Sequence, residues 1–145
     1  MIWLTLQLIS CAFLSGLIWT VQVLQYPTFK FVSETQFQRF HGFHTKRITF
    51  VVLPMMVLEL VTGAALVLNA ADSIMLWLNL FGIVLIWLCT FFISVPLHNL
   101  LAQEGNTKTI ERLISTNWVR TILWSVRLCL LLYVFLENID GPSKG

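Results

Sequence analysis

Residues 74–101 read IMLWLNLFGIVLIWLCTFFISVPLHNLL and contain no Asp, Glu, Lys or Arg. An α-helix needs about 20 apolar residues to cross a bilayer, and this stretch is longer than that. Three further apolar stretches flank it, so the chain predicts helices over residues 2–25, 33–71, 74–103 and 108–137. Because the connections between them are short, we expect an all-α, up-down bundle of four transmembrane helices in one integral membrane domain, residues 1–145.

The composition supports this class and excludes others. Apolar residues make up 57% of the chain and charged residues 11%, with a mean hydropathy of +0.81. Soluble domains carry about 25% charged residues, so this chain could not cover itself with a water-compatible surface. A net charge of +2, scattered along the chain, does not suit nucleic-acid binding. The expected surroundings are therefore the lipid bilayer.

Lysine and arginine gather at one end of the predicted bundle, which we call the basic end. It carries six of these residues, namely Lys30, Arg39, Lys46, Arg47, Lys108 and Arg112. The opposite end carries only Lys144. Since short cytoplasmic loops are enriched in Lys and Arg, we expect the basic end to be cytoplasmic, with both termini outside a bacterial inner membrane.

The start of the second helix is amphipathic. Ser33 precedes it and could cap its first amides, and Gln36 could reach back toward Ser33. The stretch from there to Arg47 is polar on one face, and the apolar run begins after it. The second helix is therefore predicted to start in the membrane interface and then enter the bilayer.

Tyr26 and Pro27 are expected to end the first helix, because the residue before a proline avoids the helical conformation.

Two charged residues predict a polar layer in the middle of the bundle. Glu59 is the only acid within a spanning segment, and Arg127 lies at a similar depth on the fourth helix. One interpretation is a structural ion pair that fixes the helix register, since removing one partner would leave a buried charge. The other is a catalytic or transport site, because ionisable groups inside membranes commonly serve function.

A second polar layer is predicted at the basic end. His41 and His44 lie one turn apart on the second helix, and His98 lies near the end of the third. Three imidazoles could hold one iron, copper or zinc ion, or a haem. Interfacial histidines that hydrogen-bond to the backbone or to lipid head groups are the alternative. The residues expected to face a substrate nearby are Gln22, Gln25, Asn117, Arg120 and Trp124, with Arg120 also a catalytic candidate.

Five short stretches resemble a family of small bacterial four-helix integral membrane proteins. They are residues 25–27, 40–44, Pro54 with Glu59, residues 95–98 and residues 116–121. The resemblance covers nearly the whole chain and implies the same four-helix architecture, but no activity. The size and helix count are also similar to those of haem-binding protoporphyrinogen oxidases and anthrone-oxygenase-like membrane proteins, which is an analogy of architecture alone.

Three functions are consistent with these patterns. The first is a metal- or haem-dependent membrane enzyme, of redox type, acting on an apolar molecule with a polar or anionic head, such as a quinone, isoprenoid, porphyrin or lipid. The second is a small oligomeric transporter or channel with Glu59 and Arg127 at its midplane. The third is a non-catalytic membrane subunit.

A homo-oligomer is also consistent with the sequence, because small residues allow helices to approach closely. These residues are Gly16, Gly63, Ala64, Ala65 and Gly82.

Overall fold

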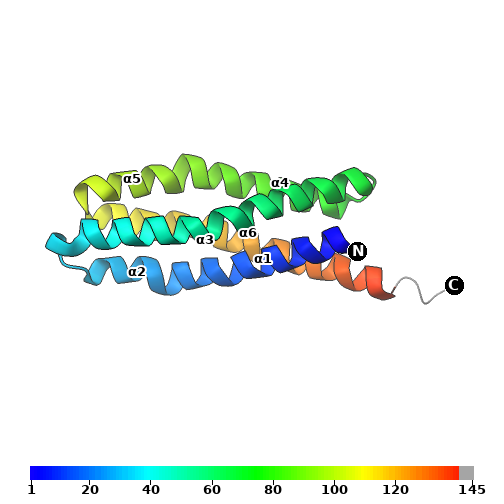
Figure 1. Cartoon of the computed structure of the whole chain (residues 1–145), viewed down its shortest axis with the longest axis horizontal. Helices are drawn as coiled ribbons and strands as arrows, with labels where there is room; N and C mark the ends of the chain where they lie inside the picture. The colour runs from blue at the N-terminus through cyan, green and yellow to red at the C-terminus, as the bar shows by residue number, and fades with distance from the viewer. Residues whose placement is uncertain (141–145) are drawn as a thin grey trace.

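Four long helical segments run side by side along one axis in the computed structural model, which describes residues 1–140 (Figure 1). The first segment consists of α1 (Ile2–Thr20), the π-helix η1 (Val21–Gln25), α2 (Tyr26–Thr28) and the 3₁₀ turn η2 (Phe29–Phe31). The second is α3 (Glu34–Asn69). The third consists of α4 (Ile74–Cys89), the π-helix η3 (Thr90–Ser94) and α5 (Val95–Glu104). The fourth is α6 (Thr107–Asp140).

The segments form the predicted up-down bundle. In cross-section the order is α1, α3, α4 and α6, with α6 returning to pack against α1. The chain starts and α6 finishes at the same end of the bundle, and the α2–α3 and α5–α6 connections lie together at the other (Figure 1). All four segments are long and apolar enough to cross a membrane. The protein is therefore an all-α, multi-pass membrane protein, and the predicted fold class is confirmed.

The prediction that Tyr26 and Pro27 end the first helix is wrong. The segment continues through both residues to Phe31, because the wider π turn of η1 comes immediately before them. A proline ring collides with the carbonyl four residues earlier in a regular α-helix, and a π turn removes that carbonyl from the way. The third segment repeats the arrangement, since η3 immediately precedes Val95 and Pro96.

The ends of the helices differ in detail from the expected caps. Ser33 occupies the N-cap position of α3 in an extended conformation, but its hydroxyl contacts the hydroxyl of Thr35 at 3.3 Å and caps no amide. Gly105 ends α5 in the left-handed conformation at φ +57°, which glycine adopts without steric cost. Lys144 lies outside the described residues.

Two of the predicted small contact residues serve packing inside the bundle. A Cβ added at Gly82 would lie 2.6 Å from Cδ of Arg127, and one added at Gly63 would lie 2.5 Å from Cδ1 of Ile83. Gly16 has no such neighbour within 4 Å. The absence of side chains at Gly63 and Gly82 therefore lets Arg127 and Ile83 fill the space between helices.

Candidate functional site

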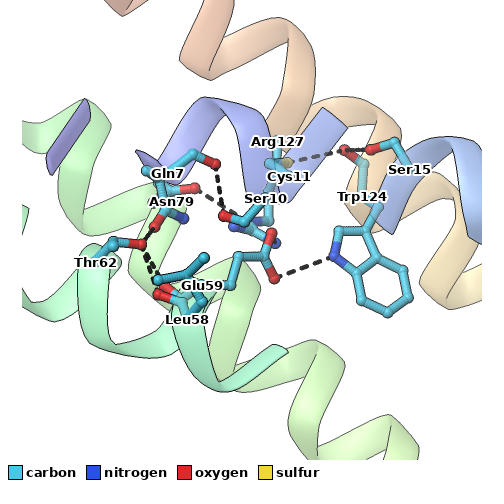
Figure 2. Close-up of polar contacts among 10 residues, drawn as sticks. All are labelled: Gln7, Ser10, Cys11, Ser15, Leu58, Glu59, Thr62, Asn79, Trp124 and Arg127. Carbon is cyan, nitrogen blue, oxygen red and sulfur yellow. Dashed lines mark hydrogen bonds and ion pairs between the residues drawn. The ribbon is translucent and has the colours of Figure 1, made fainter. Parts of the chain in front are cut away.

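The middle polar layer contains the predicted ion pair. Arg127 Nη1 lies 2.8 Å from Glu59 Oε1, within ion-pair distance but without the alignment of a hydrogen bond. The two side chains are 3% and 1% exposed, so water does not screen their attraction. Figure 2 shows Glu59 of α3 held between Arg127 and Trp124 of α6, whose indole Nε1 donates to Glu59 Oε2 at 3.2 Å. The charge of Arg127 is thus balanced inside the protein.

Neutral side chains complete this layer. Arg127 Nε donates to Oδ1 of Asn79 at 3.1 Å, and the hydroxyl of Thr62 donates to Oε1 of Gln7. On the other side, the hydroxyl of Ser15 donates to the backbone carbonyl of Trp124 at 3.2 Å (Figure 2). These contacts join α1, α3, α4 and α6, which is the arrangement expected of a structural polar core.

Arg120 lies about two helical turns from Arg127 on α6 and is 7% exposed. Its Nη1 donates to the Thr90 hydroxyl at 3.4 Å and its Nη2 to the Tyr26 hydroxyl at 3.3 Å. Nη2 also donates to Oδ1 of Asn117. All three acceptors are neutral. Among the described residues no carboxylate lies within ion-pair distance of Arg120, and its Nε is buried without a hydrogen-bond partner.

A hydrogen-bonded chain leads from Arg120 toward the basic end. The Tyr26 hydroxyl lies 3.1 Å from Nε2 of His98, and Nδ1 of His98 lies 3.0 Å from Nε2 of His41. His44 is 7% exposed and its ring centroid lies 6.3 Å from that of His98. The structure therefore brings the three histidines together, with Tyr26 as a fourth member.

The π turns account for this placement. Tyr26 follows η1 directly and His98 lies two residues beyond Pro96, which follows η3. Each π turn allows the helix to pass its proline and changes the direction in which the next residues point. Both aromatic side chains consequently face the interior beside Arg120.

A cavity of about 390 Å³ opens beside Arg120. Its polar lining residues are Tyr26, Thr45, Thr49, Thr90, Ser94, His98, Asn99 and Arg120, and the rest of the wall is aliphatic or aromatic. The apolar lining residues are Leu14, Leu17, Ile18, Val21, Ile48, Val52, Leu53, Met56, Trp87, Phe91, Val95 and Trp124. Its size falls within the range of about 300–1,000 Å³ that is usual for small-molecule sites.

The mouth of the cavity lies between the second and third segments. Of its lining residues, Thr49 and Leu53 on α3 are exposed, as are Phe91 on η3 and Val95 and Asn99 on α5. The residues contributed by α1 and α6 are buried or half-buried. The cavity therefore opens sideways, through the flank of the bundle, and its closed side is formed by α1 and α6.

The predicted site residues divide into three groups. Arg120, Trp124 and His98 line the cavity. Asn117 and Gln22 lie behind Arg120, where Nδ2 of Asn117 donates to Oε1 of Gln22 at 2.7 Å. The remaining predicted residues, which do not line the cavity, are Gln25, His41, His44, Glu59 and Arg127. Gln25 is half-buried, and its side chain forms no hydrogen bond within the described residues.

The predicted metal or haem site stays a prediction. His41 and His98 have nitrogens close enough to share a metal, but both ring nitrogens of His98 already have neighbours, His41 and Tyr26. Nε2 of His44 is buried without a hydrogen-bond partner in the described part of the chain. Over residues 1–140, no group of three His, Cys, Asp or Glu side chains is arranged to hold a metal ion.

Sequence reasoning missed three residues that shape these layers. Tyr26 was assigned to a helix end, although it links Arg120 to His98. Thr90 and Asn79, which accept hydrogen bonds from Arg120 and Arg127, were not selected. Asn79 could have been found, because an amide within so apolar a stretch needs a polar partner.

Comparison of the chain with protein-family models, curated proteins and solved structures finds no match, so the resemblance noted above stays an expectation.

Proposed function

We propose that this protein binds a lipid-soluble molecule with a polar head, which enters the lateral cavity from the bilayer. The observation that carries the proposal is the distribution of polarity in the cavity. The wall is mainly apolar, and among its polar residues Tyr26, Thr90, His98 and Arg120 are joined by hydrogen bonds, in a network that Thr45, Thr49, Ser94 and Asn99 do not join. Such a wall accommodates a hydrocarbon tail, while a small number of polar groups orient the head.

The position of the mouth supports access from lipid. Its exposed rim residues belong to helices that are long and apolar enough to span a membrane. An amphiphile could therefore enter without passing through water. By the same proposal, the site lies toward the cytoplasmic face of a bacterial inner membrane, with both termini outside. The enrichment of Lys and Arg at the connections near the site supports this orientation.

A metal- or haem-dependent redox reaction on the bound molecule is a second candidate. The specific observation in its favour is the 3.0 Å separation of His41 Nε2 and His98 Nδ1, since two nitrogens that ligate one metal at about 2.0–2.1 Å also lie close together. Visible absorption and elemental analysis of the purified protein test it. A Soret band or stoichiometric iron or copper would support this candidate, and a protein without haem, iron or copper would remove it, since zinc is not redox-active.

Saturable binding of a neutral amphiphile tests the cavity itself. We expect the purified chain to bind radiolabelled methyl oleate with one site per protein. Val52→Trp should weaken binding at least about tenfold, because the indole would fill a cavity that Val52 lines. Val57→Trp, on an exposed position of the same helix outside the cavity, is the matched control. Binding that never saturates, or that Val52→Trp leaves unchanged, would contradict the proposal.

A further inference from the structure

We propose that the head of the bound molecule is an oxyanion and that Arg120 is its counter-ion. This inference deepens the proposed function, since it rests on the same cavity and names the chemical class of its ligand. It starts from the only buried arginine within residues 1–140 that has no acidic partner. The other buried arginine, Arg127, is paired with Glu59 at 2.8 Å.

The charge of Arg120 cannot be removed by deprotonation, because a guanidinium stays protonated in proteins. A buried charge in a membrane protein is costly unless another charge or strong hydrogen bonds compensate it. Thr90, Tyr26 and Asn117 provide hydrogen bonds but no negative charge. An anion in the adjoining cavity would complete the compensation that the protein leaves unfinished.

Arg120 also retains a donor for such an anion. Its Nε lacks a partner in the described structure, and because this atom is buried, the guanidinium would have to turn to present it to a ligand in the cavity that the residue lines. Nη1 contributes a single long hydrogen bond of 3.4 Å to Thr90, which an anionic oxygen could replace. Nε and Nη1 lie on different edges of the guanidinium, so each would bind a carboxylate or phosphate oxygen separately, and hydrogen bonds of this charged type are stronger than neutral ones.

Tyr26 adds a second donor at the same place. Arginine can only donate, so the Tyr26 oxygen accepts from Arg120 and its hydrogen is directed elsewhere. When His98 carries its hydrogen on Nδ1, Tyr26 donates to His98 Nε2. When His98 instead donates from Nε2, the Tyr26 hydrogen is free to point toward a ligand oxygen. Arg120 and Tyr26 together would then hold one oxyanion.

The test compares ligands that differ in the charge of the head. Competition against labelled methyl oleate would be measured for oleate, hexadecyl phosphate and oleyl alcohol with the full-length protein in neutral detergent. At least one of the two anions should bind about tenfold or more tightly than methyl oleate and oleyl alcohol, because a charged hydrogen bond replaces a neutral one. Which anion is favoured distinguishes a carboxylate head from a phosphate head.

Two variants locate the effect. Arg120→Gln should abolish the preference for the anion while methyl oleate still binds. Arg112→Gln removes one positive charge from an exposed position of the same helix and should keep the preference. Arg120→Lys retains the positive charge but not the several donors of the guanidinium, and it should keep part of the preference for the anion.

Each outcome bears on the inference. Equal binding of anions and neutral amphiphiles by the wild-type protein would overturn the role of Arg120 and leave the cavity proposal intact. Failure of every amphiphile to bind would overturn both proposals. Should Arg120→Gln fail to fold, the selectivity of the wild-type protein and of Arg120→Lys decides the question. Unchanged selectivity in a folded Arg120→Gln would assign anion binding to another residue and refute the inference.

Discussion

Arg127 and Arg120 occupy the same helix, are similarly buried and differ mainly in what surrounds them. Arg127 contacts Glu59 and Asn79, and a Cβ on Gly82 would collide with its aliphatic stem. Arg120 contacts only neutral acceptors and lines a cavity. The first arginine has its charge balanced within closely packed surroundings, whereas the second is held in place with its charge unbalanced.

On the proposal made above, this difference separates a structural charge from a binding charge. Burial alone does not distinguish the two, since both arginines are less than a tenth exposed. The partner set does, because an arginine paired with a carboxylate gains little from a second anion. Substitution of Arg127 should therefore mainly lower stability, whereas substitution of Arg120 should mainly weaken ligand binding.

Loss of one partner of the middle ion pair should have the largest effect on stability. Glu59→Leu or Arg127→Leu leaves the other charge buried and unpaired, at a cost of about 3–5 kcal/mol. The double variant should lose clearly less than the sum of the two single losses, which a double-mutant cycle of thermal unfolding in detergent would measure. Additive losses, or two single variants with the melting temperature of the wild-type protein, would show that the pair is not coupled.

A single methyl group at Gly82 should have an intermediate effect. The added Cβ would lie 2.6 Å from Cδ of Arg127, so Gly82→Ala must shift the aliphatic stem of the arginine and disturb its contact with Glu59, with a cost of about 1–3 kcal/mol. Gly16→Ala is the matched control, since nothing lies within 4 Å of its added Cβ, and alanine favours a helix. Chemical unfolding of both variants would measure the difference, and equal stability would refute the close packing around Arg127.

Arg120→Gln should have the smallest effect on stability of the three. It removes hydrogen bonds to Thr90, Tyr26 and Asn117, but it also removes a buried charge that has no acidic partner and strands no carboxylate. Because these effects partly offset, we expect a loss of no more than about 1 kcal/mol in the absence of ligand. Thermal unfolding of Arg120→Gln and Arg127→Leu under the same conditions would compare their losses of stability. A loss as large as that of Arg127→Leu would mean that Arg120 also carries a structural charge, and the contrast between them would disappear.

The long apolar runs were enough to predict the four helices and their up-down order, because spanning a bilayer requires a minimum apolar length. The pairing of Glu59 with Arg127 could also be predicted, since an acid and a base at equal depth have few other ways to be compensated. Both predictions depend on helix length and depth rather than on details of the helical turns.

Residues near the π turns could not be placed in the same way. The expectation that Gln25 shares the inward face with Gln22 assumed a constant 100° per residue. The π turn η1 contains both residues and widens the helix there, so Gln22 is buried, Gln25 is only half-buried and Tyr26 is inside. The cavity escaped prediction for a similar reason, because its wall is formed by side chains from four segments whose relative rotation the sequence pattern does not specify.

The sideways mouth of the cavity affects how affinity for this protein has to be expressed. A ligand that arrives from the bilayer is supplied at its concentration within the lipid, and this exceeds its concentration in water by the partition coefficient. Doubling the amount of lipid at a constant total amount of ligand would dilute it and reduce occupancy, even though the aqueous volume is unchanged. Occupancy should therefore follow the mole fraction of ligand in the membrane, so that two amphiphiles with equal contacts in the cavity can differ widely in apparent aqueous affinity.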